Sequence, residues 1–164
     1  MSDPEITVAA LAENDGRFLL VEERIGGRLV LNQPAGHLEP GETLFEAVVR
    51  EAREETAWRF TPEWLLGVYL WRQPRTQRLY KRFAFIGSLS DHRPEQPLDT
   101  GIVGTRWLSG GEVRARASEL RSPLVLRCIE DYLAGVRAPL DPLARLDLEA
   151  AAAVPAQTLC SASS

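Results

Sequence analysis

The sequence predicts an α/β fold, more strictly α+β, in which helices flank a mixed sheet as an α/β/α sandwich. Apolar runs of strand length lie on both sides of one long helical pattern, residues 43–56. Turns rich in glycine and proline separate these runs. The chain has 164 residues, of which 45% are hydrophobic and 26% charged, so we expect one domain with a single core.

Short strands are expected in the N-terminal part. Residues 6–11 and 18–21 are apolar runs separated by Asn14-Asp15-Gly16, which is a strong hairpin signal. Gly26-Gly27 then turns the chain into another short strand, residues 28–31.

The next segment, residues 32–41, contains two prolines and two glycines, so it is predicted to be a structured loop. A helix follows, because Thr43-x-x-Glu46 has the form of a capping box. Good helix formers continue to about Thr56.

Two long strands, residues 64–71 and 79–89, are predicted in the second half and are connected after Pro74 through residues 75–77. Residues 105–108 form a shorter strand.

Two helices close the domain. The first follows Gly110-Gly111 and has a weak helical pattern. The second has a clearer pattern and runs from Ser122-Pro123 to Tyr132, with proline at the first helical position.

The composition changes from Val136 onward, where prolines, alanines and serines become frequent. We therefore expect one domain over residues 1–139 and a Pro/Ala-rich C-terminal tail over residues 140–164. Three leucines of the tail suit a short helix packed on the body or on a neighbour: Leu143, Leu146 and Leu148.

Composition and charge exclude several classes of protein. A net charge of −4 gives no general attraction to nucleic acids or anionic membranes, so a phosphate-bearing substrate would need local cations. Residues 1–5 lack the features of a signal peptide, and no apolar run reaches the length of a membrane span, so a cytoplasmic protein is expected. The two cysteines, Cys128 and Cys160, indicate no zinc site or disulfide framework, and Cys128 fits a core position.

The helix over residues 43–56 carries an unusual group of carboxylates. At 100° per residue, with Glu51 at 0°, Glu54 lies at about 300° and Glu55 at about 40°, so all three fan across one face. Glu51 and Glu55 repel each other at i, i+4, and the last helical turn favours cations instead. An acidic face exposed to water is one explanation, and hard oxygen ligands for Mg²⁺ or Mn²⁺ are the other.

The surrounding residues favour the metal site, because they resemble the Nudix box: Gly, five residues, Glu, seven residues, then Arg-Glu-apolar-x-Glu-Glu. Chance agreement at this spacing has odds on the order of 10⁻⁵. Ala57 departs from the box, which expects a glycine suited to a left-handed helix end. The matching residues are Gly36, Glu42, Arg50, Glu51, Glu54 and Glu55.

A wider resemblance is to the NudJ phosphatase branch of Nudix hydrolases. Residues 32–39 and 120–125, and the layout from about Thr7 to Pro139, look like that branch. The resemblance implies hydrolysis of nucleoside di- and triphosphates, or of the thiamine-precursor pyrimidine diphosphate, with release of phosphate. It implies a small-molecule partner, no nucleic acid, no membrane, and a monomer or homodimer.

The resemblance also assigns roles to the box residues. It implies that Glu51, Glu54 and Glu55 bind Mg²⁺, or Mn²⁺ in its place, with the Gly36 carbonyl as a further ligand. Catalytic roles are implied for Glu51, Glu54, Arg50 and Glu42. Arg50 and Glu42 are expected to hold the ligands in place, since Arg50 can pair with Glu54 one turn further along the helix. The alternative for Arg50 is a surface ion pair that contributes little to stability.

The sequence leaves several candidates for the general base. Many Nudix enzymes add an acid from a loop, where this chain has Gly101, and Asp99 lies two residues earlier. Asp99 is therefore a candidate loop acid, although a lone loop aspartate is more often a turn former. Otherwise Glu51 or Glu54 would activate the water.

Substrate contacts are expected from the strand over residues 79–89 and its neighbour. Lys81 and Arg82 alternate, so only one faces the site, and the resemblance favours Arg82. Trp71 can stack on a base or pyrimidine ring, as can Tyr69, and ordinary sheet packing is the alternative for both. A non-catalytic nucleotide-sensing regulatory domain with the same fold is the alternative function, and it would expect substituted metal glutamates.

Overall fold

The structure, a computed structural model, describes residues 3–144 of the chain. The predictions for Leu146, Leu148 and Cys160 lie outside the described residues. No helix in the described part is long and apolar enough to cross a membrane.

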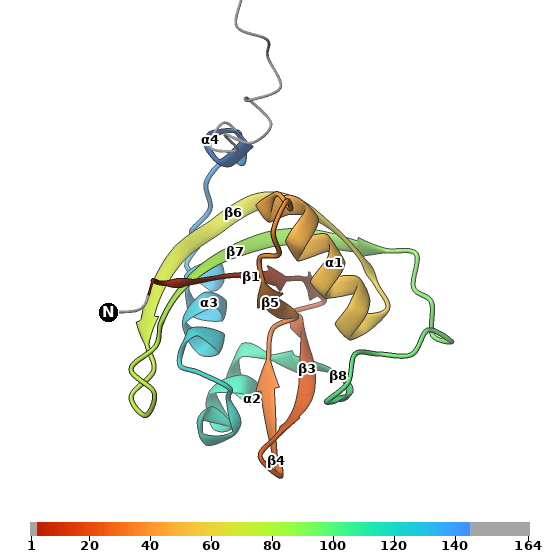
Figure 1. Ribbon diagram of the computed structural model, residues 1–164. Coiled ribbons are helices and arrows are strands. Elements are labelled where there is room, and N and C mark those ends of the chain that lie inside the picture. The colour runs from red at the N-terminus through yellow and green to blue at the C-terminus, as the bar shows by residue number, and fades with distance from the viewer. Residues whose placement is uncertain (1–2, 145–164) are drawn as a thin grey trace, which may run out of the picture.

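Two four-stranded sheets form the centre of the molecule (Figure 1). In the first sheet β1 and β7 are parallel and the other neighbours are antiparallel, so the sheet is mixed as predicted. Its order is β5 (Ala35–His37), β1 (Glu5–Leu11), β7 (Leu79–Ser90) and β6 (Arg59–Arg72). The second sheet is antiparallel, and β3 (Arg17–Ile25) pairs there with β4 (Arg28–Asn32), β2 (Glu13–Asn14) and β8 (Ile102–Ser109).

Helices cover both faces of the first sheet, which confirms the predicted α/β/α layering. Side chains of β1 alternate between two buried clusters. Val8 and Ala10 pack with α1 (Leu44–Thr56), whereas Ala9 and Leu11 pack toward α2 (Gly110–Ala115) and α3 (Leu124–Leu133). Figure 1 shows α1 and α3 separated by the β1–β7 sheet. Two short elements complete the fold, η1 (Ala117–Glu119) and α4 (Asp141–Ala144).

The main error in the predicted elements concerns residues 32–41. This segment is not wholly a loop, because Ala35–His37 forms β5 and pairs with β1 through Thr7 to Ala9. A three-residue strand next to Pro34 gives no alternation to detect, so only long-range pairing reveals it. The strand β6 also starts five residues earlier than expected, and Pro62 is accommodated next to an irregularity in its pairing with β7.

The described start of the predicted tail packs on the body. Ala138 pairs with Leu65 on β6, and Leu140 and Leu143 pack on the core cluster beside α1. Leu143 lies in the short helix α4, which agrees with the short helix predicted there, and the domain boundary stays a prediction. Pro123 caps α3 and precedes its first assigned residue, within the usual uncertainty of helix ends.

Both ends of α1 are well defined. The capping box forms as predicted, since Thr43 Oγ1 accepts from the Glu46 amide at 3.1 Å and Glu46 accepts from the Thr43 amide at 3.0 Å. At the other end Ala57 takes the left-handed conformation, with φ 61°, that the box assigns to glycine. Arg53 donates to the Ala57 carbonyl at 2.9 Å and holds this exit in place.

Candidate metal centre and substrate pocket

The carboxylates of α1 face β5 at close range. A Cβ atom added at Gly36 would overlap the Glu51 carboxylate, so any larger residue here would require that carboxylate to move. The residue spacing of the box therefore has a direct steric meaning here: the glycine lets the glutamate carboxylate lie against the β5 backbone.

Glu51, Glu54 and Asp99 come together at the C-terminal end of α1. One carboxylate oxygen from each lies within 4.8 Å of the other two. The backbone N–H of Asp99 donates to the Glu54 carbonyl at 2.9 Å, which ties the loop before β8 to the end of the helix. Sequence spacing could not show this contact, because the loop reaches α1 only through the fold.

The electrostatics of this group fit a cation. Burial raises the pKa of Glu51, and the charges of Glu54 and Asp99 raise it further, while Arg50 acts against the rise. Arg50 pairs with Glu51 and Glu54 of this group and also with Glu42, so the carboxylates outnumber their guanidinium. Hard oxygens are the donors that Mg²⁺ and Mn²⁺ prefer. The donor set therefore suits a divalent metal ion.

Arg50 connects the acidic groups. Its Nε and Nη2 donate to the two carboxylate oxygens of Glu42 at 2.6 and 2.8 Å, and Nη1 donates to Glu51 at 2.9 Å and Glu54 at 3.2 Å. Nη2 also donates to the His37 carbonyl at 3.0 Å. This pairing holds the pKa of the Glu42 carboxyl below its usual range. Arg50 therefore fixes two carboxylates of the cluster and joins α1 to β5.

Glu55 lies apart from the three-carboxylate group. Its side chain is buried and accepts a hydrogen bond from the Ala35 amide at 3.0 Å. Burial raises the pKa of Glu55 to about 8, and the charges of Glu51, Glu23 and Asp99 add to the rise. The role of Glu55 as a metal ligand stays a prediction.

The raised pKa of Glu55 predicts a pH-dependent stability. Between the ordinary pKa of 4.5 and the raised value, the folded protein keeps a proton that the unfolded chain has lost. The metal-free protein should therefore lose about 2 kcal/mol of unfolding free energy from pH 5.5 to 7. Urea unfolding in EDTA measures this. Glu55→Gln keeps the acceptor for Ala35 and should flatten the profile, and an equally steep profile in the variant would show that another group is responsible.

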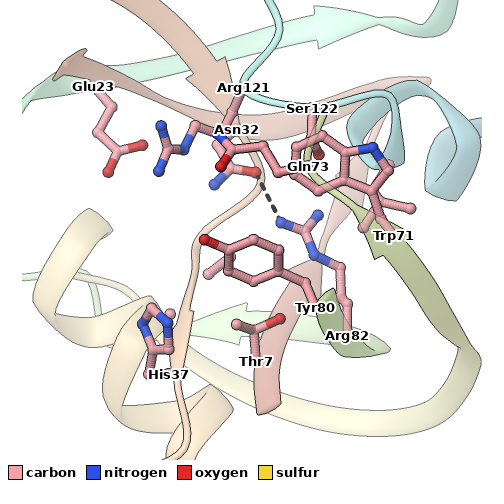
Figure 2. A pocket seen from close by; sticks show the side chains of 13 residues that line it. Thr7, Glu23, Asn32, His37, Trp71, Gln73, Tyr80, Arg82, Arg121 and Ser122 are labelled. Carbon is pink, nitrogen blue, oxygen red and sulfur yellow. Dashed lines mark hydrogen bonds between the residues drawn. The ribbon is translucent and has the colours of Figure 1, made fainter. Parts of the chain in front are cut away.

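A pocket adjoins the carboxylates and has a cavity volume of about 160 Å³ (Figure 2). Gly36 lines it on the side of the metal candidates. Both sequence-predicted substrate residues, Arg82 and Trp71, line it as well. The Arg82 side chain is buried, and the Trp71 ring stacks on Tyr80 with centroids 5.8 Å apart.

Tyr69, the other aromatic candidate, has a different position. It is absent from the pocket lining, and its hydroxyl donates instead to Asp131 on α3 at 2.8 Å. His37, in the segment predicted as a loop, ends β5 and lines the pocket, and its ring pairs with Glu5 at 2.7 Å. Four further residues line or adjoin the pocket without a role predicted from the sequence: Asn32, Gln33, Arg121 and Ser122.

Comparison with known proteins assigns the class. The NUDIX domain model matches residues 2–128, so the chain belongs to the Nudix family, and it is a Nudix phosphohydrolase. The phosphatase NudJ of Escherichia coli (strain K12) is 43% identical over 141 residues, which cover 86% of this chain and 91% of that protein. NudJ of Shigella sonnei (strain Ss046) has the same identity and coverage.

Solved structures agree with this assignment. A NUDIX hydrolase from Nitrosomonas europaea has a TM-score of 0.83 and 50% identity, over 85% of this chain and 95% of that one. A UDP-X diphosphatase has a TM-score of 0.68 at 21% identity, over 85% of this chain and 67% of that one, and shows the shared fold alone.

Proposed function

We propose that this enzyme uses Mg²⁺, or Mn²⁺ in its place, to hydrolyse a phosphoanhydride bond and release phosphate. The proposed substrates are nucleoside di- and triphosphates or the thiamine-precursor pyrimidine diphosphate. One observation carries the proposal: Glu51, Glu54 and Asp99 converge beside a pocket that contains buried Arg82. The NudJ relatives, phosphatases by name, support the release of phosphate.

When bound, a divalent cation would supply positive charge to the phosphate oxygens and lower the pKa of a water molecule. Glu51, Glu54 and Asp99 would hold the cation, with the Gly36 carbonyl and Glu55 as further candidate ligands. Arg50 and Glu42 would keep Glu51 and Glu54 in position through the hydrogen bonds described above. A carboxylate of the cluster would take the proton of the water, and Asp99, the most exposed of the three, joins Glu51 and Glu54 as a candidate base.

A substrate panel tests the proposal. Purified protein with Mg²⁺ should release orthophosphate from nucleoside di- or triphosphates or from the pyrimidine diphosphate. EDTA should abolish release, and added Mg²⁺ or Mn²⁺ should restore it. Dinucleotides and sugar nucleotides provide the comparison. Binding of a nucleotide without release of phosphate would favour the non-catalytic sensor instead, and release that is insensitive to EDTA would contradict the metal role.

Substitution of Gly36 should impair the site without changing any ligand. In Gly36→Ala the new methyl would overlap the Glu51 carboxylate, so that carboxylate must leave its present position beside Glu54 and Asp99. We expect phosphate release to fall about 30-fold or more, since misplaced groups lose much of their effect. Gly111→Ala is the control, because its Cβ would meet only Ser109 Oγ at 3.9 Å. Equal activities of the two variants would refute the proposed packing.

A further inference from the structure

Arg82 is a buried cation that forms no salt bridge with the described part of the chain. Only 7% of the residue is exposed. Nη1 donates to Gln33 at 3.1 Å and Nη2 to Asn32 at 3.3 Å, both neutral amide oxygens, and buried Nε has no hydrogen-bond partner among the described residues. Arg82 takes part in no ion pair within residues 3–144. A buried guanidinium without a carboxylate is costly, so this arrangement favours an anion supplied by a ligand.

The rest of the pocket is suited to the same ligand. Arg121 extends from the other wall in Figure 2, and it too forms no ion pair with a described residue. Ser122 Oγ is buried and lacks a hydrogen-bond partner in the part of the chain that the structure describes. Glu23 is the one lining carboxylate in the described part, so two arginines outnumber it. The pocket is therefore cationic, with donors left free.

The pocket lies next to the carboxylate cluster. Gly36 lines the pocket and also lies against the Glu51 carboxylate. In Figure 2 the side next to α1 carries His37, the middle carries Arg121 and Arg82, and Trp71 lies on the far side. A ligand in the pocket can therefore contact the arginines and the indole, and its end at Gly36 lies near the cluster.

We propose that Arg82 and Arg121 form a phosphate subsite for the non-terminal phosphoryl group of the substrate, the group that carries the organic substituent. The proposal rests on the proposed function, which assigns the terminal phosphoryl group to the carboxylate cluster. The organic substituent then lies toward Trp71 and Tyr80. A diphosphate substrate leaves a monophosphate ester after hydrolysis, and this product keeps the same subsite, so it binds without metal and inhibits competitively.

Binding to the metal-free protein tests this directly. Uridine monophosphate and uridine differ only by the phosphate, and both are titrated in EDTA, with inorganic phosphate as a third probe. The monophosphate should bind at least tenfold more tightly than uridine, since hydrogen bonds between charged groups are the strong ones. It should also shift the ¹⁵N–¹H resonance of the Arg82 Nε–H, which is assigned by its absence in Arg82→Lys.

Two variants sharpen the test. Arg121 is exposed, so Arg121→Gln should fold normally and should bind the monophosphate about fivefold more weakly, without any change for uridine. Arg82→Lys keeps the charge but loses the planar fork, and should weaken binding at least tenfold. Arg116→Gln, an exposed arginine outside the pocket lining, is the matched control and should bind like the wild type.

The outcomes separate the subsite from the proposed function. Uridine that binds as tightly as its monophosphate, or an Arg121→Gln variant with unchanged affinity, overturns the subsite even if phosphate release is normal. Metal-free binding of the monophosphate that depends on both arginines supports the subsite even if no substrate is hydrolysed. In that second case only the proposed function fails.

Discussion

Glu54→Gln should lower Mg²⁺-dependent phosphate release by about 10³-fold while the protein stays folded. The substitution removes one negative charge from the group formed with Glu51 and Asp99. A weakened cation site forfeits several kcal/mol of transition-state stabilisation, which corresponds to this loss in rate. Folding should be unaffected, because Glu54 is only half-buried and the change relieves repulsion between like charges.

The measurement is the initial rate of orthophosphate release at saturating Mg²⁺, together with a thermal melt. Glu95→Gln is the matched control, since Glu95 is exposed and outside the cluster, and it should behave like the wild type. An active, folded Glu54→Gln variant would refute the role of the cluster.

Arg50→Met should destabilise the metal-free protein by about 3 kcal/mol, because Glu42, Glu51 and Glu54 lose their shared cation. Mg²⁺ should restore part of this loss, since a bound cation replaces the missing positive charge. Phosphate release should fall about 100-fold, in line with the loss of groups that orient metal ligands. Urea unfolding with EDTA and with Mg²⁺ measures the first two effects.

Arg114→Met provides the comparison for Arg50. Arg114 also forms an ion pair, with Glu130 at 2.9 Å, but both side chains are exposed, so little stability should be lost and Mg²⁺ should change nothing. A variant at Arg50 that is as stable as the one at Arg114, and equally insensitive to Mg²⁺, would mean that the carboxylates do not depend on a cation.

Local signals in the sequence predicted much of the fold. The capping box at Thr43 acts through neighbouring residues and forms as predicted. The spacing from Gly36 to Glu51 indicated the box, whereas the packing of the two residues against each other is seen only in the structure. The C-terminal end of α1 was harder to predict, because Ala57 takes a left-handed conformation that its residue type disfavours. Contacts from Arg53, which donates to the Ala57 carbonyl, fix it there.

The rest of the site depends on contacts between distant segments. Asp99 reaches Glu54 through a loop whose sequence resembles an ordinary turn. Alternation in a strand can place Lys81 and Arg82 on opposite faces, but only the packed structure shows that Arg82 is buried beside neutral Asn32 and Gln33. Long-range pairing also creates β5, which no local pattern indicates.

Direct metal binding tests whether glutamates of α1 and the loop aspartate form a divalent metal site. Mn²⁺ titration followed by electron paramagnetic resonance gives the affinity without any substrate. The wild type and Glu95→Gln should bind Mn²⁺ with equal affinity, and Glu54→Gln and Asp99→Asn should each bind at least tenfold more weakly. If both Glu54→Gln and Asp99→Asn bind Mn²⁺ with unchanged affinity, these carboxylates do not form the metal site.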